Sequence, residues 1–247
     1  MKLQLALDVA TLDEALVVSR AAAEYVDILE LGSTLIKNEG TAAISAIKAT
    51  HPGTTVLADM KTAEAGGLEA GLAFAAGADL VTVLDGADDD TIAAAVAVAR
   101  SHGKGVVADM ITARELVARA REVVRLGAEF CEIHAGPDGE APRGWSIRAV
   151  IEAGRQSEVP FSVAGGVDLE SIGDVARSGA VVAVVGTAVT AAPDPRAAAR
   201  GLRVAVDTTI VGGEVPWVRQ GRPHGIPSGP GPAPARPDRL ADRAPSS

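Results

Sequence analysis

The stretch VLADMKTAEAGG, residues 56 to 67, places three charged side chains directly after an apolar run. Asp59 and Lys61 are two positions apart, and Glu64 follows three positions later. Alternate residues of a β-strand project to the same face, so a strand through this run would present Asp59 and Lys61 together. Such a pair is either a structural ion pair or a site that binds a metal ion and stabilises a developing oxyanion.

Further polar residues end other apolar runs along the chain, namely Asp8, Glu30, Asp85, Asp109 and His134. A single aspartate at such a place is most simply a cap of the following helix. Several carboxylates gathered around one point are different, because burying them is costly unless a cation or a substrate compensates their charge. We therefore expect a ligand where these run ends meet.

The residue types at the run ends favour magnesium over zinc. Glu30 and Asp59 stand on successive runs and suit an octahedral Mg²⁺, which takes one or two protein carboxylates and completes its coordination with water and substrate. The chain has no cluster rich in histidine or cysteine that would suggest zinc. His134 ends a run of its own, and an imidazole with an ordinary pKa of about 6.5 is suited to proton transfer at neutral pH.

Two glycine motifs end the last two apolar runs, VAGG at 163–166 and VVGT at 184–187. Backbone without side chains can approach an anion closely and can present N–H donors near the start of a helix. The last two loops of many (β/α)₈ barrels bind phosphate in this way. We predict a phosphate site here; the alternative is that both motifs only form tight turns.

The elements that must position these residues repeat one pattern eight times. Short runs rich in Val, Leu and Ile lie at 2–8, 26–32, 55–61, 79–85, 105–111, 129–135, 160–166 and 181–187. Ala-rich segments with helical spacing separate them, and each unit of roughly 22 to 30 residues fits a strand, a crossover helix and two loops. Eight such units predict an α/β fold closed into a (β/α)₈ TIM barrel. A doubly wound sheet is the alternative, but LALDVATLDEA lacks the glycine fingerprint that would follow its first strand.

Composition divides the chain into one domain and a tail. We assign residues 1–207 to a single barrel catalytic domain and residues 208–247 to a Pro/Gly/Arg-rich disordered tail, which holds eight of the fourteen prolines. The net charge of -9 argues against nucleic acid or an anionic membrane as the partner. No apolar run approaches the roughly 18 residues that a membrane span needs. The single cysteine and the absence of a signal-like start lead us to expect a cytoplasmic protein.

Six motifs together resemble the orotidine-monophosphate-decarboxylase superfamily, and most closely its 3-hexulose-6-phosphate synthase branch. In chain order they are LQLALD, DILELGSTLIKNEG, VLADMKTAEAGG, EIHAG, VAGGV and VVGTAVTAAPDP. The similarity runs from Met1 to about Val206 and leaves out the tail. No single motif is specific, but their order and spacing across all eight units are.

The resemblance implies an Mg²⁺-dependent aldol condensation of D-ribulose 5-phosphate with formaldehyde through a metal-stabilised enediolate. It makes Glu30 and Asp59 the metal ligands and Lys61 the group that neutralises the enediolate oxygen. His134 becomes the acid/base, and Asp8 orients Lys61 or substrate hydroxyls. The substrate contacts that it implies are Ser33 on a loop and Gly165, Gly166, Gly186 and Thr187 around the phosphate. Whether the reaction serves formaldehyde fixation, detoxification or ribulose 5-phosphate supply stays open.

The sequence departs from the family pattern at three places. The family signature is Asp-x-Lys-x-x-Asp, and its last acid reaches the partner subunit's site; here that acid is Glu64, so the resemblance implies a homodimer with shared active sites. Misplacement of a catalytic group by about 1 Å can cost on the order of a hundredfold in rate, so a catalytically impaired, sugar-phosphate-binding barrel is one alternative. Ser33 replaces the usual threonine, and the loop AGPDGEAPRG follows His134.

A 3-keto-L-gulonate-6-phosphate decarboxylase, which would use the same enediolate, is the other alternative. Those decarboxylases carry an arginine three residues after the histidine, where this chain has Pro137. That difference favours the synthase.

Overall fold

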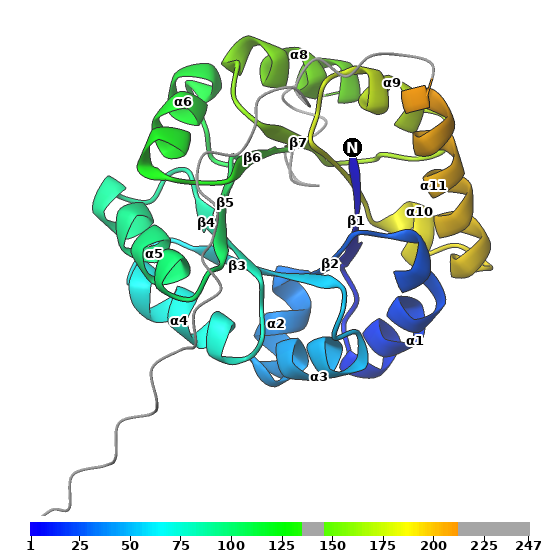
Figure 1. Ribbon diagram of the computed structural model, residues 1–247, viewed down its shortest axis with the longest axis horizontal. Coiled ribbons are helices and arrows are strands. Elements are labelled where there is room, and N and C mark those ends of the chain that lie inside the picture. The colour runs from blue at the N-terminus through cyan, green and yellow to red at the C-terminus, as the bar shows by residue number, and fades with distance from the viewer. Residues whose placement is uncertain (135–145, 212–247) are drawn as a thin grey trace, which may run out of the picture. The chain divides into compact units, whose positions relative to one another are not determined.

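Eight parallel strands form a closed barrel in the order β1 to β8 in the computed structural model, which describes residues 1–134 and 146–211. Figure 1 shows the strands as an inner ring with the helices outside it. The strands are β1 Lys2–Leu7, β2 Ile28–Leu31, β3 Thr55–Thr62, β4 Leu80–Leu84, β5 Gly105–Asp109, β6 Phe130–Ile133, β7 Phe161–Val163 and β8 Val182–Val185. All eight predicted strands are present, and the prediction of a TIM barrel is confirmed.

Helices connect each strand to the next and cover the barrel. They are α1 Leu12–Ala22, η1 Ala23–Tyr25, α2 Ser33–Glu39, α3 Ala42–Thr50, α4 Gly66–Ala75, α5 Asp89–Ser101, α6 Leu116–Leu126, α8 Ile147–Ser157, α9 Ile172–Arg177, α10 Thr187–Thr190 and α11 Pro195–Val211. Sequence signals fix several of their ends. Thr11 and Glu14 form a capping box at the start of α1, and Gly127 ends α6 in the left-handed conformation.

The apolar core has two parts, one between strands and helices and a smaller one inside the barrel. The smaller part is aliphatic and aromatic near the start of the strands, with Ile28, Leu80, Phe130 and Val182. Higher in the barrel lies a layer of buried polar side chains, Gln4, Glu30, Thr82, Glu132 and Ser162. Buried polar groups need partners. This layer lies toward the carboxyl ends of the strands, where the sites of barrel enzymes are found.

Strand β3 is irregular where it reaches the charged residues. Its pairing with β4 shifts between Ala58 and Thr62, and Lys61 has φ 46°, in the left-handed region. The backbone N–H of Lys61 donates to Thr82 Oγ1 (2.9 Å) instead of continuing the ladder. Asp59 and Lys61 therefore do meet, but through a bulge and not through the regular alternation that the sequence predicted.

The last helix continues past the predicted end of the domain. Helix α11 runs to Val211, so residues 208–211 belong to a helix and not to a tail. Residues 212–247 lie outside the described part, and the disordered tail stays a prediction. Within the described ranges, no helix is both long and apolar enough to cross a bilayer.

Candidate active site

Lys61 links two buried aspartates at the carboxyl end of the barrel. Its Nζ lies 2.5 Å from Asp109 Oδ2 on β5 and 3.0 Å from Asp59 Oδ2 on β3. Burial would lower the pKa of the ammonium, but the two carboxylates outweigh it and raise the pKa above its ordinary value. Lys61 is therefore a permanently charged donor, and the bulge in β3 aims it across the barrel mouth.

His134 follows β6 and joins the same network through Asp109. Its Nε2 lies 2.9 Å from Asp109 Oδ1. Although burial opposes ionisation, His134 and Lys61 together lower the pKa of Asp109 to about 2, so Asp109 is an acceptor at neutral pH. Nε2 must then carry the hydrogen, which leaves Nδ1 as the nitrogen that can exchange a proton with a substrate. Asp109 also raises the pKa of His134, against the effect of burial, which makes the imidazole a stronger base.

Asp59 is fixed from both sides by hydroxyl groups. Thr82 Oγ1 donates to Asp59 Oδ1 (2.7 Å), and Ser33 Oγ, in the first turn of α2, donates to Oδ2 (2.7 Å). The hydroxyl that Ser33 shares with the family threonine thus orients a carboxylate. The structure brings Ser33, Asp59, Lys61 and His134 into one network, with Asp109 as the link between the last two.

Glu30 lies in the buried polar layer below this network. The amide of Gln4 donates to Glu30 Oε2 (2.7 Å) and to Glu132 Oε2 (3.2 Å). The pKa of Glu30 is raised well above its ordinary value, first by burial and then by Glu132, Asp59 and Asp8. Burial raises the pKa of Glu132 to about 7, where His134 and Lys61 oppose the rise.

Asp8 directly follows β1 at the same mouth. A β-carbon on Gly32 would stand 2.1 Å from Asp8 Oδ1, so the glycine at this position leaves room for the carboxylate. Burial and the nearby charge of Asp59 raise the pKa of Asp8. No hydrogen bond joins Asp8 to Lys61, although both are described, but the positive charge of Lys61 is close enough to oppose this rise in the pKa.

The two glycine loops follow β7 and β8, and β8 pairs with β1 to close the barrel. Gly165 and Gly166 follow β7 with φ 90° and 71°, and a β-carbon on Gly166 would meet nothing within 4 Å. Gly186 precedes α10, and Thr187 is its first residue. Positive φ favours glycine at the first loop, which is open at Gly166, whereas a β-carbon on Gly186 would lie 3.8 Å from Asp8 Oδ2.

Glu64 stands apart from the network. It lies exposed in the loop between β3 and α4, and it makes none of the hydrogen bonds or ion pairs that join the described residues of the site. The loop AGPDGEAPRG with Pro137 lies outside the described residues.

Asp85, a further strand-end aspartate, has a structural role. Its Oδ1 accepts from Thr112 Oγ1 (2.6 Å) and from the Thr112 backbone N–H (3.1 Å), which closes the loop after β5.

Sequence reasoning did not assign four residues that the structure places in or under the site. Asp109 was recognised only as a strand end, although its position on β5 between β3 and β6 makes it the link. Thr82 and Gln4 are single polar residues within apolar runs, and Glu132 lies on β6 two positions before His134. A polar residue at an inward position of a barrel strand is the signal that could have found them.

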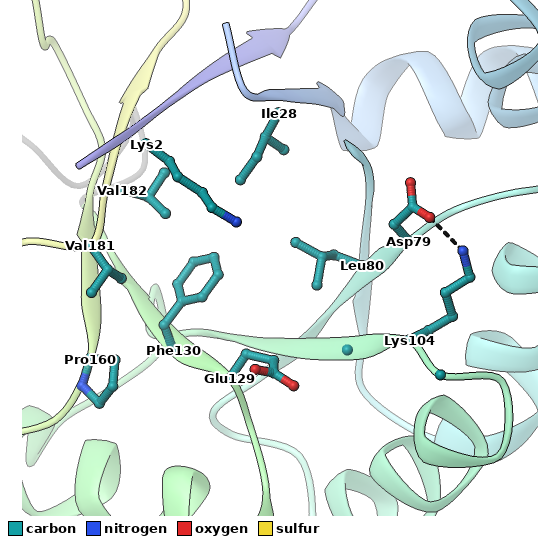
Figure 2. A pocket seen from close by; sticks show the side chains of 12 residues that line it. Lys2, Ile28, Asp79, Leu80, Lys104, Glu129, Phe130, Pro160, Val181 and Val182 are labelled. Carbon is teal, nitrogen blue, oxygen red and sulfur yellow. Dashed lines mark hydrogen bonds and ion pairs between the residues drawn. The ribbon is translucent and has the colours of Figure 1, made fainter. Parts of the chain in front are cut away.

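The opposite end of the barrel holds a hollow of about 450 Å³. Figure 2 shows Lys2 reaching over an apolar floor of Ile28, Leu80 and Phe130, with Asp79 paired to Lys104 at the edge. Catalytic groups of barrel enzymes lie at the carboxyl ends of strands, and none of the predicted site residues lines this hollow. It is therefore separate from the candidate active site.

The carboxylates at the active mouth fit a divalent cation by their charge. Asp8, Glu30, Asp59, Asp109 and Glu132 influence one another there, against the positive charges of Lys61 and His134. In the described part of the chain, no group of three or more His, Cys, Asp or Glu side chains is arranged so that it could hold a metal ion by itself. Magnesium does not need such a group, because water and substrate complete its shell.

Comparison with known proteins extends over almost the whole barrel. Residues 1–202 match the model of the "Orotidine 5'-phosphate decarboxylase / HUMPS family". A 3-hexulose-6-phosphate synthase from Mycobacterium gastri is 52% identical over 206 residues, which cover 83% of this chain and 100% of that protein.

Two solved structures are also similar. One is a crystal structure of a 3-hexulose-6-phosphate synthase, with a TM-score of 0.81, 53% identity and coverage of 83% of this chain and 100% of that one. The other is a 3-keto-L-gulonate-6-phosphate decarboxylase from Vibrio cholerae O1 biovar El Tor, with a TM-score of 0.72, 30% identity and coverage of 84% and 98%.

Proposed function

Because this chain belongs to the orotidine 5'-phosphate decarboxylase / HUMPS family and is a carbon–carbon lyase, we propose that it condenses formaldehyde with D-ribulose 5-phosphate to a 3-hexulose 6-phosphate. The observation that carries the proposal is the buried network in which Asp109 joins the ammonium of Lys61 to the imidazole of His134. A fixed positive donor and a strengthened base at one barrel mouth suit the formation and use of an enediolate.

The residues divide the work of the reaction. His134 Nδ1 takes the proton from C1 of the sugar phosphate, and Lys61 donates a hydrogen bond to the oxygen on which negative charge develops. The C1 carbon then attacks the formaldehyde carbon, and the new alkoxide takes the proton back from the imidazolium of His134. Asp8 hydrogen-bonds substrate hydroxyls, while the loops of Gly165, Gly166, Gly186 and Thr187 hold the phosphate. Because Lys61 is already held by Asp59 and Asp109, it needs little reorganisation as the charge appears.

Magnesium is part of the proposal. Glu30 and Asp59 would hold it, and when bound it would act as a Lewis acid toward the substrate oxygens. The excess of carboxylates over positive side chains at this mouth supports such a site.

A direct assay tests the reaction. The full-length purified chain, incubated with Mg²⁺, ribulose 5-phosphate and formaldehyde, should consume the two substrates in equal amounts, and chelation of Mg²⁺ should stop it. Unchanged formaldehyde would contradict the proposal.

A related decarboxylation is the second candidate, favoured by the 30% identity to the Vibrio cholerae enzyme. Release of CO₂ from 3-keto-L-gulonate 6-phosphate, without formaldehyde consumption, would establish that alternative.

We also propose that the active unit is a homodimer to which each subunit contributes Glu64. Glu64 is exposed, and Leu68 (68%) and Leu72 (51%) are exposed one helical turn apart on α4, directly after it. Among the described residues Glu64 has no hydrogen-bond or ion-pair partner, and an apolar stripe beside such an acid suits a second copy of the chain.

Subunit mixing tests the shared site. The variants Lys61→Met and Glu64→Ala should each be nearly inactive alone. Mixed dimers should regain activity, because one of their two sites then combines an intact Lys61 with an intact Glu64 from the partner. Activity that does not recover on mixing would contradict the sharing. A large gain in turnover on Glu64→Asp would show that this chain is catalytically impaired at that position.

A further inference from the structure

The amide of Gln4 occupies a central place in the barrel interior. Gln4 is 0% exposed, and its Nε2 donates to Glu30 on the neighbouring strand β2 and to Glu132 on β6, across the barrel. Both carboxylates are almost completely buried, at 4% and 3% exposed. One neutral side chain therefore joins two acidic groups that would otherwise repel each other.

The orientation of this amide is set by the two carboxylates. Nε2 has two hydrogens, and the two contacts use both of them. Gln4 Oε1 is buried without a hydrogen-bond partner among the described residues, and such an orphaned acceptor is costly. The opposite orientation would place Oε1 against two carboxylate oxygens, which is worse when either is ionised. The cost at Oε1 thus indicates that fixing the carboxylates dominates here.

We propose that Gln4 and Glu132 are positioning residues that hold the Glu30 carboxylate in the orientation in which it binds a divalent cation. The inference rests on the proposed magnesium site and names the residues that orient its ligand Glu30. Gln4 engages Glu30 Oε2, and within the described ranges no hydrogen bond engages Oε1, so one oxygen is anchored and the other is available. A neutral amide suits this task, because a lysine or arginine would supply the positive charge that the cation must bring.

Glu132 acts through Gln4. It receives the second N–H of the amide, so the amide cannot rotate away from Glu30. His134 follows its strand β6 directly, two positions after Glu132, so the strand that anchors the amide also leads into the base. Removal of Glu132 should therefore matter less than removal of Gln4, and its effect should depend on Gln4 being present.

Metal binding without substrate provides the test. Titration calorimetry of metal-free protein with Mn²⁺ as the probe should give a Kd for Gln4→Leu that is raised roughly 10- to 100-fold. Glu132→Ala should raise it less, and in the Gln4→Leu background it should add almost nothing. Glu132→Gln keeps an acceptor oxygen for the amide and should stay within about threefold of wild type. Ser162→Ala is the matched control, because Ser162 lies in the same buried layer without contacting Glu30, and its Kd should not change.

The outcomes separate this inference from the proposed function. Wild-type protein that condenses the substrates and binds Mn²⁺, together with an unchanged Kd for Gln4→Leu, would overturn only the positioning role. Wild-type protein that binds no Mn²⁺ would overturn both. If Gln4→Leu does not fold by circular dichroism, the comparison of Glu132→Ala with Glu132→Gln decides, since equal Kd values for these two would contradict the inference. In assays, Gln4→Leu should raise the Mg²⁺ concentration for half-maximal rate more than it lowers kcat at saturating Mg²⁺.

Discussion

Each end of the barrel carries a cluster of three charged side chains, and the signs of the charges are exchanged between the two clusters. At the carboxyl end one lysine, Lys61, lies between the aspartates Asp59 and Asp109, whose side chains are only 5% and 0% exposed. At the amino end one aspartate, Asp79, lies between Lys48 and Lys104 and is 23% exposed. The same ionic chemistry thus occurs twice, but buried with excess negative charge at one end and partly solvated at the other.

The difference shows which cluster is able to bind a ligand. Asp79 is satisfied by its two lysines and by the backbone N–H of Val56 (2.9 Å), so it ties α3 and two strand starts together. The cluster around Lys61 includes His134 and lies above the two carboxylates of the polar layer, so its excess of acidic groups is balanced either by protons or by a bound cation. Burial and imbalance, and not the presence of ion pairs, distinguish the active end.

Replacement of one lysine at each end of the barrel, Lys61 or Lys48, should give the largest difference in kcat between the two ends. Lys61→Met should lower kcat by roughly 10²- to 10³-fold, because it removes the donor to the developing oxyanion. Lys48→Met at the amino end should leave kcat within about twofold. Initial rates of formaldehyde consumption measure both, with circular dichroism as the control for folding. If kcat of Lys61→Met is within tenfold of wild type, Lys61 is not the donor to the developing oxyanion.

Asp109→Asn should have the next largest effect, a loss of roughly 100-fold in kcat, because the amide no longer holds His134 in one tautomer or pairs with Lys61. The pKa of His134 should fall toward its ordinary value, since Asp109 raises it. A raised imidazole pKa stabilises the fold at low pH, and this stability is lost as pH rises through that pKa. Asp109→Asn should therefore reduce the loss of stability above about pH 6.5, which urea unfolding at several pH values measures. An unchanged pH profile would show that the pair is not coupled.

Glu132→Gln should change the pH dependence of stability over a lower pH range. The folded pKa of Glu132 is raised from 4.5 to about 7, so the folded state keeps a proton that the unfolded state has lost. Stability should therefore fall as pH rises from 4.5 through 7, by about 3 kcal/mol at most. Glu132→Gln should remove the part of this slope that Glu132 contributes, while the raised pKa of Glu30 maintains the rest. Urea unfolding of metal-free protein across this range is the measurement, and an identical slope in the variant would contradict it.

Asp79→Asn should give the smallest effect and complete the comparison. The partly exposed pairs at the amino end contribute about 1 kcal/mol, and the active end is untouched. We expect a small loss of unfolding free energy with kcat within about twofold of wild type. A loss of activity greater than tenfold without unfolding would show that the two ends are coupled.

Local sequence patterns were sufficient for the architecture. Eight apolar runs separated by helical segments predicted the barrel, because strand and helix periodicity are properties of neighbouring residues. The carboxyl ends of parallel strands meet at one mouth, so the ends of the runs also predicted that Asp59, Lys61 and His134 would lie together. The contact that joins them was not predicted, because Asp109 and His134 are 25 residues apart and their side-chain directions depend on the closed barrel.

The sequence by itself determined which chemical groups the protein has and on which end of the barrel they lie. The tertiary structure decided how they are used. The bulge in β3 that turns Lys61 depends on pairing with β4, and Gln4 meets Glu132 across 128 residues only when the barrel closes. Register and closure are collective properties of eight strands, so the partners of a polar side chain, its burial and therefore its charge state are set by the fold as a whole.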